Sequence, residues 1–273
     1  MEHLWGQARA QGQPAAAPTD HFNGKGDEAT ARSLRALSEQ IISCTRCPRL
    51  IAHCRDIAAT KRRAYADWDY WGKPLPGFGD PKARLLIIGL APAAHGGNRT
   101  GRMFTGDGSA DWLVEAMYTY GFATQPRSVS RDDGLRLKDA YVTAAARCAP
   151  PANRPTAAEL RNCQPFLERE LDLLKHVQVV LVLGQIAFET YWRVLRARND
   201  VGSGVKRPRF AHGARYRFGP DTPVLLMSYH PSRQNTQTGR LTRAMFHHVF
   251  ATARAILDGR GDSSGDAVSR FPG

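Results

Sequence analysis

The sequence contains no apolar stretch long enough to cross a membrane, since such a span needs about 18 consecutive apolar residues. Its opening stretch, residues 1–20, is rich in Ala, Gln and Pro and lacks the apolar core of a secretory signal peptide. No segment recurs with a period of about 20–50 residues, which excludes solenoids and propellers. We therefore expect a cytoplasmic protein without a membrane partner, with one folded domain among its 273 residues.

Acidic residues are few compared with basic ones. The chain has 25 Asp and Glu against 38 Lys and Arg, a formal net charge of +13. Such an excess favours a polyanionic partner, and nucleic acid is the leading candidate. The signatures GxGxxG and GxxxxGK(S/T) are both missing, so no common nucleotide-binding loop explains the charge.

The five cysteines have a spacing typical of metal binding. In a reducing compartment they are not expected to form disulfides. Two thiolates two residues apart can face one ion, and a distant second pair completes a set for zinc or an iron–sulfur cluster. The wide second spacing and the Cys47-Pro48 dipeptide favour a [4Fe–4S] cluster. The predicted ligands are Cys44, Cys47, Cys148 and Cys163. Cys54 is interpreted as an ordinary buried thiol or, with His53, as an alternative ligand.

Short apolar runs alternate with helical patterns in the middle of the chain. The predicted buried strands are residues 84–90, 139–145, 177–183 and 224–228. The predicted helices are residues 111–120, 156–175, 185–196 and 241–257, and Thr156 with Glu159 has the spacing of a capping box. This alternation predicts an α/β fold, a three-layer α/β/α sandwich around a central, mostly parallel four-stranded sheet.

The polar, Gly- and Ala-rich ends of the chain show no apolar periodicity. We therefore expect a disordered leader over residues 1–30, a folded domain over residues 31–258 and a disordered tail over residues 259–273. In parallel sheets, ligands bind beyond the carboxyl ends of the strands. The loops after Leu90, Ala146 and Ser228 fall there, and they contain the unusual residues of the chain.

The first of these loops, residues 89–107, leaves a strand and enters a helix. Its glycines allow backbone amides to approach a ligand closely. Phe104 is either a core side chain or an exposed ring on which a base stacks. Arg99 and Arg102 are either solvated charges or phosphate contacts.

Residues 89–107 run Gly-Leu-Ala-Pro to Phe-Thr-Gly-Asp, and residues 230–241 begin His-Pro-Ser-Arg-Gln-Asn-Thr. With the four cysteines, these two loops resemble the family 5 (type b) uracil-DNA glycosylases, the iron–sulfur branch of that superfamily. The resemblance covers about Leu37 to Leu257. It implies a DNA-repair hydrolase that flips uracil, and other deaminated bases such as hypoxanthine, out of DNA and leaves an abasic site. It also implies one structural [4Fe–4S] cluster, a monomer, and association with the nucleoid through DNA.

The resemblance assigns the central chemical role to His230, which matches the catalytic histidine of the family. A donor beside the carbonyl oxygen of the leaving uracil anion lowers the barrier to bond cleavage. Many superfamily members carry Asp, Asn or Glu where this chain has Ala91, which supports the type 5 assignment but leaves the attacking water without an activator. Asn98 is the preferred polar candidate for that task, ahead of His95 and Asp107.

The remaining candidates contact the substrate. Asn153 reads the uracil edge or the sugar, or else is a turn former in a proline-rich loop. Ser232 and Arg233, with the following Gln234, press into the duplex beside the flipped nucleotide. The residues available for phosphates are Arg240 and Arg243.

Two other functions are compatible with parts of the sequence. A zinc-dependent deaminase or nuclease is the first, since cysteines and histidines bind catalytic zinc, but the H-x-E and P-C-x-x-C signatures of deaminases are missing. A non-enzymatic iron–sulfur protein that binds nucleic acid would explain the net charge and the cysteines. That alternative leaves His230 and Phe104 without a role.

Overall fold

The computed structural model describes residues 25–260. Helix α1 (Lys25–Ile42) begins before residue 31, so residues 25–30 are helical and do not belong to a disordered leader. The rest of the predicted leader and nearly all of the predicted tail lie outside the described residues. Among the residues that are described, no helix combines the length and the apolar character needed to span a bilayer.

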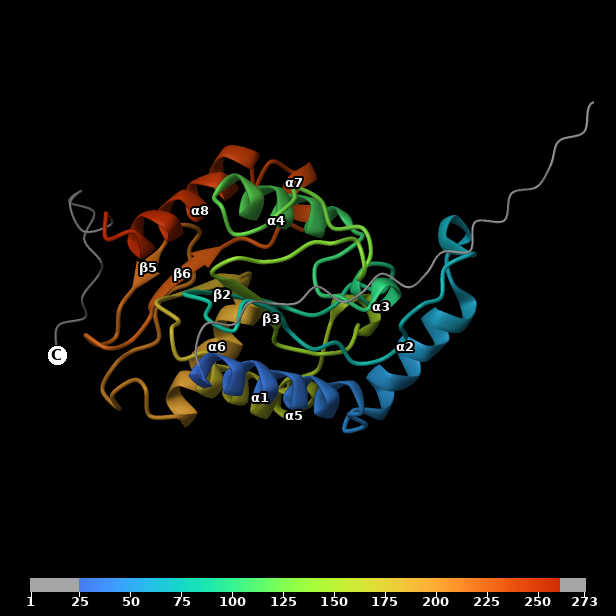
Figure 1. The fold of residues 1–273 in the computed structure, drawn as a ribbon, viewed down its shortest axis with the longest axis horizontal. Coiled ribbons are helices and arrows are strands. Elements are labelled where there is room, and N and C mark those ends of the chain that lie inside the picture. Colours follow the sequence, from blue (N-terminus) through green and yellow to red (C-terminus); the bar gives the residue numbers. More distant parts are fainter. Residues whose placement is uncertain (1–24, 261–273) are drawn as a thin grey trace, which may run out of the picture.

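The centre of the molecule is a mixed, mostly parallel sheet (Figure 1). Its four inner strands are parallel and entirely buried, and each confirms a predicted strand to within about two residues: β3 (Ala140–Ala144), β2 (Leu85–Gly89), β4 (Val179–Leu183) and β6 (Val224–Ser228). Continuous runs of Val, Leu and Ile suit strands that are covered on both faces.

The sheet has six strands, so the prediction of four was wrong. The order is β1-β3-β2-β4-β6-β5, with β1 (Phe78–Gly79) and β5 (Arg215–Tyr216) pairing antiparallel at the two edges. Each edge strand is two residues long, too short to show any hydrophobic periodicity in the sequence. Very short edge strands also limit pairing with other chains.

Helices cover both faces of the sheet. On one face lie α1, α5 (Ala157–Leu173) and α6 (Gln185–Ala197); on the other lie α4 (Gly108–Thr119) and α8 (Arg243–Leu257) (Figure 1). Two large clusters of buried side chains, one for each face, form the core. Thr156 and Glu159 form the predicted capping box at the start of α5. The layers therefore agree with the predicted sandwich, although its sheet is wider.

Helices α1 and α2 (Pro48–Thr60), of 18 and 13 residues, were not predicted, nor were the shorter helical segments. Helix α2 projects beside the sheet, with α3 (Gly97–Thr100) next to it (Figure 1). The others are the 3-10 turns η1 (Arg63–Tyr65) and η2 (Pro151–Asn153) and helix α7 (Arg233–Gln237). Segments of three to five residues fall below the length at which a helical period can be recognised.

A buried ion pair joins the end of β3 to α5. Arg147 is 1% exposed and its guanidinium donates to the Glu170 carboxylate at 2.7 Å. Thr143 also donates to Glu170, and the Leu75 N–H donates to the Arg147 carbonyl. A buried charge is tolerated only when it is paired and hydrogen-bonded in this way. The network fixes the segments that carry Cys148 and Cys163.

Candidate active site

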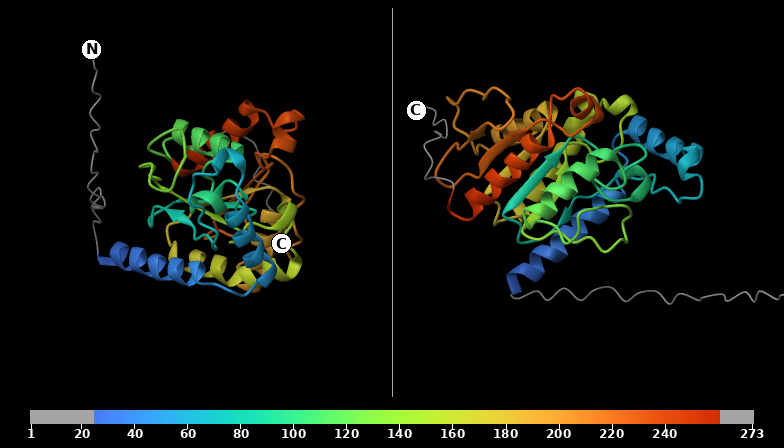
Figure 2. Two further views of the ribbon diagram at one scale, coloured as in Figure 1. Left: turned by 90° about the vertical axis from the view of Figure 1, so that its right-hand side faces the viewer. Right: turned by 90° about the horizontal axis from the view of Figure 1, so that it is seen from above.

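The predicted site loops leave the carboxyl ends of neighbouring parallel strands. Gly89 at the end of β2 pairs with Ala144 of β3, and Leu183 of β4 pairs with Ser228 of β6. The loops that follow therefore meet at one edge of the sheet, toward which the left view of Figure 2 is turned. This edge is where an open α/β sheet binds ligands.

His230 follows β6 and is held by its backbone. The Ser232 N–H and the Asn235 side-chain amide both donate to the His230 carbonyl at 2.8 Å. Gly184, which follows β4, lies beside His230. A Cβ added at Gly184 would be in van der Waals contact with the His230 Cβ, at 3.4 Å. Burial lowers the pKa of the half-buried His230 imidazole to about 4. The ring is therefore neutral near pH 7 and is able to donate a hydrogen bond without carrying charge.

Phe104 lies against His230, although the two are far apart in the sequence. Their ring centroids are 6.1 Å apart, with 29° between the planes. Phe104 has a φ of +46°, which is strained for a residue with a bulky side chain. Such strain is maintained only where surrounding contacts fix it, and it is typical of functional sites.

The backbone of Gly89 carries the Phe104 ring. A Cβ at Gly89 would lie 2.6 Å from the ring atom Cζ, closer than real contacts allow. We expect Gly89→Ala to displace the ring and to lower kcat/KM for base excision by about tenfold or more, since misplaced site groups are costly. The matched control is Gly108→Ala at the start of α4, where an added Cβ meets nothing within 4 Å. Equal kinetics for the two variants would contradict this role of Gly89.

Asn98 is completely buried in α3. Its Nδ2 donates to the Cys54 carbonyl at 3.2 Å, and the Gly72 N–H donates to the Asn98 carbonyl. Its Oδ1 is buried and has no hydrogen-bond partner. Asn98 thus connects the glycine-rich loop to helix α2, and its Oδ1 is available to accept a hydrogen bond.

The two arginines of this loop are neither solvated nor free for phosphates, so both predicted alternatives were wrong. Arg99 is 3% exposed, with its guanidinium 3.9 Å from the Tyr65 ring centroid and 4.1 Å from that of Trp68. Arg102 is 7% exposed, and its Nη2 donates to both carboxylate oxygens of Asp133 at 2.8 Å. Both arginines fix the shape of the loop from inside.

The other polar side chains of the loop also have structural partners. His95 Nδ1 lies 3.1 Å from the Tyr70 hydroxyl. Asp107 caps α4, because its Oδ1 accepts from the N–H groups of Ser109 and Ala110. Burial raises the pKa of Asp107, while these N–H groups oppose the rise. Both bonds go to Oδ1, whereas Oδ2 faces Gly96, where an added Cβ would lie 2.0 Å from it.

Asn153 lies in an exposed, strained turn. It ends η2, and both Ala152 (φ +52°) and Asn153 (φ +56°) adopt left-handed conformations. Asparagine tolerates this region better than most residues, so the turn-forming role is compatible with the geometry. Its exposure is equally compatible with a substrate contact at this edge.

The segment after His230 presents polar side chains. Ser232 is the half-buried residue before α7, and Arg233 is exposed at its start. The guanidinium of Arg240 lies 4.5 Å from the centroid of the Tyr229 ring. Arg243 pairs with Glu115 and covers the Trp112 ring, so it is not a free phosphate ligand.

Sequence reasoning missed His212. Its Nδ1 accepts from the Tyr229 N–H at 3.2 Å, and its ring stacks on Tyr229 with centroids 5.2 Å apart. His212 therefore supports the residue immediately before His230. It comes from an irregular loop before β5, and no motif in the sequence marks it.

The predicted cluster ligands fall in three groups of buried side chains, with Cys47 and Cys148 in one, Cys163 in another and Cys44 packed against a third. Cys47 and Cys148 share a buried group with Leu50 and Cys54. Cys163 interacts electrostatically with Cys44 and Cys47, and Cys148 with Cys44 and Cys163. All five cysteines are free thiols. Over residues 25–260, however, no three His, Cys, Asp or Glu side chains form a group arranged to hold a metal ion.

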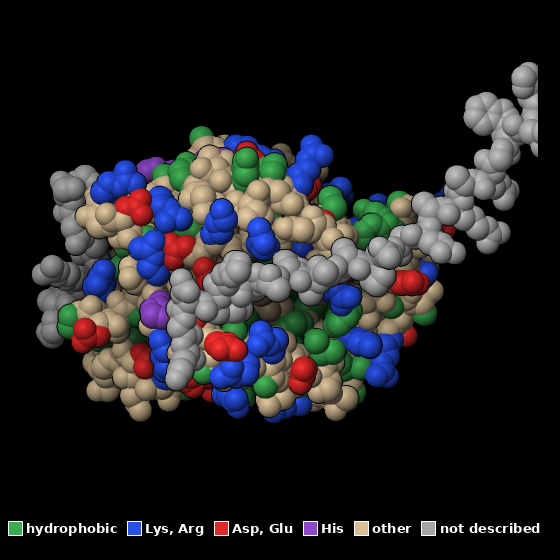
Figure 3. Space-filling view, viewed as in Figure 1, with side chains coloured by type: hydrophobic (Ala, Val, Ile, Leu, Met, Phe, Trp, Pro, Cys, Tyr) green, Lys and Arg blue, Asp and Glu red, His purple; other side chains and the backbone are tan. Residues whose placement is uncertain are grey.

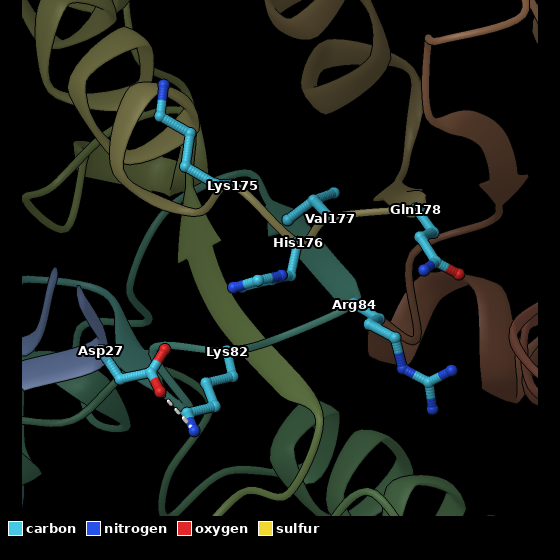
Figure 4. A pocket seen from close by; sticks show the side chains of 7 residues that line it. All are labelled: Asp27, Lys82, Arg84, Lys175, His176, Val177 and Gln178. Atoms are coloured by element: carbon cyan, nitrogen blue, oxygen red, sulfur yellow. Dashed lines mark ion pairs between the residues drawn. The ribbon is translucent and has the colours of Figure 1, made fainter. Parts of the chain in front are cut away.

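A cavity of about 450 Å³ lies at the opposite edge of the sheet (Figure 4). It is bordered by residues that precede β2 and β4, and by Asp27, which pairs with Lys82. None of the predicted site residues lines it. Lys and Arg side chains are also spread over the face in Figure 3 and do not gather in one patch. Neither feature competes with the carboxyl edge as the active site.

The chain is similar to known uracil-DNA glycosylases over most of its length. The model of the uracil DNA glycosylase superfamily matches residues 76–254. A type-5 uracil-DNA glycosylase of Mycobacterium bovis is 46% identical over 83% of this chain and 82% of its own length. One from Thermus thermophilus is 47% identical over 81% of this chain and 97% of its own length.

More distant relatives belong to a neighbouring branch. A type-4 uracil-DNA glycosylase of Archaeoglobus fulgidus is 27% identical over 73% of this chain and 82% of its own length. The identities are clearly higher with the type-5 proteins, and the matched residues include both site loops. The chain therefore belongs to the uracil-DNA glycosylase superfamily and, within it, to the type-5 uracil-DNA glycosylases.

Proposed function

We propose that this protein hydrolyses the N-glycosidic bond between uracil and deoxyribose in DNA and leaves an abasic site. The observation that carries the proposal is a neutral His230 stacked on Phe104 at the carboxyl edge of the sheet. The reaction class is a repair hydrolysis, in keeping with the family.

The reaction places charge on both departing partners. The electron pair of the C–N bond passes to the base, which leaves as an anion, while the sugar gains positive charge. A water oxygen then bonds to the sugar carbon and its proton is released to solvent or to the departed base. An N–H of His230 directed at a uracil carbonyl oxygen stabilises the anion, and a neutral donor in a partly buried site does so effectively.

Phe104 and Ala91 shape the place for the flipped base. The Phe104 ring, fixed over Gly89, offers an aromatic surface for stacking. Ala91 packs its methyl group against the cluster of apolar residues around Cys163 and brings no polar group to the site. A small apolar neighbour is compatible with larger purines, so we extend the proposal to hypoxanthine in DNA.

Asn98 is our proposal for the residue that holds the attacking water. Its Nδ2 is engaged by the Cys54 carbonyl, which fixes the direction of the amide and leaves Oδ1 as a buried acceptor without a protein partner. Such an atom requires a donor, and a water molecule is the smallest one. Asn153, Ser232 and Arg233 are proposed to contact the flipped nucleotide and its strand from the exposed rim.

The cysteines fit one structural [4Fe–4S] cluster held by Cys44, Cys47, Cys148 and Cys163. Three segments far apart in the sequence converge through them, and Asn162 Nδ2 donates to Cys47 Sγ at 3.4 Å, as groups around cluster sulfurs do. When bound, the cluster supplies covalent Fe–S links between these segments. The protein around it adds an Arg49–Glu159 ion pair at 2.7 Å between α2 and α5.

The proposal is tested with a labelled duplex that contains one uracil, incubated with the purified protein and then cleaved with alkali. We expect strand cleavage at the uracil, and slower cleavage at hypoxanthine. A matched duplex with thymine is the control and should stay intact. An iron-loaded protein that binds the duplex but yields no abasic site would instead support the non-enzymatic alternative.

A further inference from the structure

We propose that residues 127–131 form a second DNA-contacting loop and that Val129 inserts into the duplex beside the flipped base. The inference rests on the proposed function, because an enzyme that flips a base leaves a gap in the stack. Opening that gap disrupts base pairing and stacking and so costs free energy. Apolar side chains pushed between base steps offset this cost in proteins that distort DNA.

The segment after His230 has no apolar side chain for this task, since Ser232, Arg233 and Gln234 are all polar. Three large apolar side chains are exposed within residues 25–260: Tyr118, Val129 and Ile186. Val129 is the most exposed of them, at 55%. It is also the one in a loop that is hydrogen-bonded directly to the glycine-rich loop, residues 89–107.

Ser128 anchors this loop. It is 1% exposed, and its hydroxyl lies 2.7 Å from both the Arg102 guanidinium and the Thr105 hydroxyl. Its carbonyl accepts from the Gly106 N–H at 2.9 Å. Thr105 and Gly106 follow Phe104 directly in the sequence, so the anchor of Val129 belongs to the same loop as Phe104.

The backbone around Val129 is held in place by hydrogen bonds. Its N–H donates to the Asp133 carboxylate at 2.8 Å, and the same carboxylate holds the buried Arg102 guanidinium. Arg102 also donates to the Arg131 carbonyl at 3.1 Å. A side chain that inserts between bases as a wedge must keep its position, and the ion pair between Arg102 and Asp133 fixes the loop that carries Val129. This role also explains why an arginine of the glycine-rich loop is buried.

The charges around Val129 suit DNA. Arg127 and Arg131 are exposed on either side of it, and Asp132, the one exposed acid of this stretch, lies 3.7 Å from Arg131. Arg131 lies 4.9 Å from the centroid of the Trp71 ring. Trp71 borders a hollow of about 530 Å³, whose lining includes Arg55 and Lys73 and no acidic side chain. These cations provide a path for the phosphates next to the lesion.

The other two exposed apolar side chains are less suitable. Ile186, the second residue of α6, is 38% exposed against 55% for Val129, and it lies one turn before Glu189, whose carboxylate is 3.7 Å from Arg207. Tyr118 lies near the far end of α4, about 15 Å along the helix from the end that faces the site. Tyr118 is therefore a control for the general effect of removing a surface apolar group.

The test compares kcat/KM for uracil in a duplex with that for uracil in the same strand without its complement. Base flipping must disrupt base pairing only in the duplex. The ratio of the two values of kcat/KM therefore measures how much the inserted side chain helps to open the duplex. We expect Val129→Ser to lower this ratio about tenfold, Val129→Leu to preserve it, and Tyr118→Ser to match the wild type. Thermal unfolding of each variant checks that the fold is intact.

The outcomes separate the two proposals. A wild-type protein without activity on either substrate overturns the proposed function and, with it, the wedge. A wild-type protein that is active while Val129→Ser leaves the ratio unchanged overturns the wedge alone. The wedge is also overturned if Tyr118→Ser lowers the ratio as much as Val129→Ser does.

Discussion

Replacing His230 with alanine is expected to lower kcat for uracil excision by about 10²–10³, or roughly 3–4 kcal/mol of transition-state stabilisation, as for loss of one donor to a developing anion. The affinity for uracil-containing duplex should change little, because the exposed cations that face DNA lie on other residues. Single-turnover kinetics together with a binding titration measure both effects. Asn235→Ala, which removes one hydrogen bond to the His230 carbonyl, should cause a smaller loss.

The pH profile tests the protonation state of His230. Burial lowers its pKa from 6.5 to about 4, so the folded protein binds this proton more weakly than the unfolded chain does. His230 should therefore cause no loss of kcat between about pH 8 and 5, and activity should fall as the pH drops toward 4. The same shift removes folding stability as the pH falls from about 6.5 to 4. A loss of activity centred near pH 6.5 that is absent in His230→Gln would contradict a neutral, buried imidazole.

Removing one cluster ligand is expected to release the iron and to loosen the N-terminal part of the described domain. Cys163→Ala takes a ligand from α5, whereas Cys54→Ala removes the buried thiol that we do not assign as a ligand. For Cys163→Ala we expect loss of iron and sulfide and a fall in Tm of about 10 °C, which is roughly 3 kcal/mol for a domain of this size. Helix α2 is attached by few other bonds, chiefly Arg49 to Glu159 and Asn98 to the Cys54 carbonyl.

Metal analysis and thermal unfolding check this result. Cys54→Ala should retain iron and sulfide in equal amounts, and its Tm should fall by less than that of Cys163→Ala. Zinc in place of iron in the purified protein would refute the proposed cluster. Iron lost from Cys54→Ala and kept in Cys163→Ala would show that the ligand set is wrong.

Much of the fold could be predicted because its signals are local. The inner strands are continuous runs of Val, Leu and Ile, and the start of α5 is marked by Thr156 and Glu159. The edge strands β1 and β5 have no such signal, since two residues show no period and pairing with a neighbour is what makes them strands. Helices α3 and α7 were missed for the same reason of length.

The glycine-rich loop, residues 89–107, shows most clearly what could not be predicted from the sequence. His230 was singled out from the loop around it and Phe104 was left as either a core side chain or a stacking ring; in the structure the two ring centroids are 6.1 Å apart. Arg99 and Arg102 have the same sequence appearance as solvated cations. What decides their role is Tyr65 and Trp68 for one and Asp133 for the other, all at least 30 residues away along the chain.

The α/β class, the inner strands and the two loops that mark the family could be predicted from the sequence, because each depends on composition or spacing within a short stretch. Which cations are buried, the contact of His212 with the residue before His230, and the exposure of Val129 could be found only from the folded protein. The reason is physical: burial and charge pairing depend on residues that folding brings close in space and that the chain keeps far apart. The two loops identify the family from short stretches of sequence, whereas the hydrogen bonds of Arg102 to Ser128 and Asp133 can be found only in the folded protein.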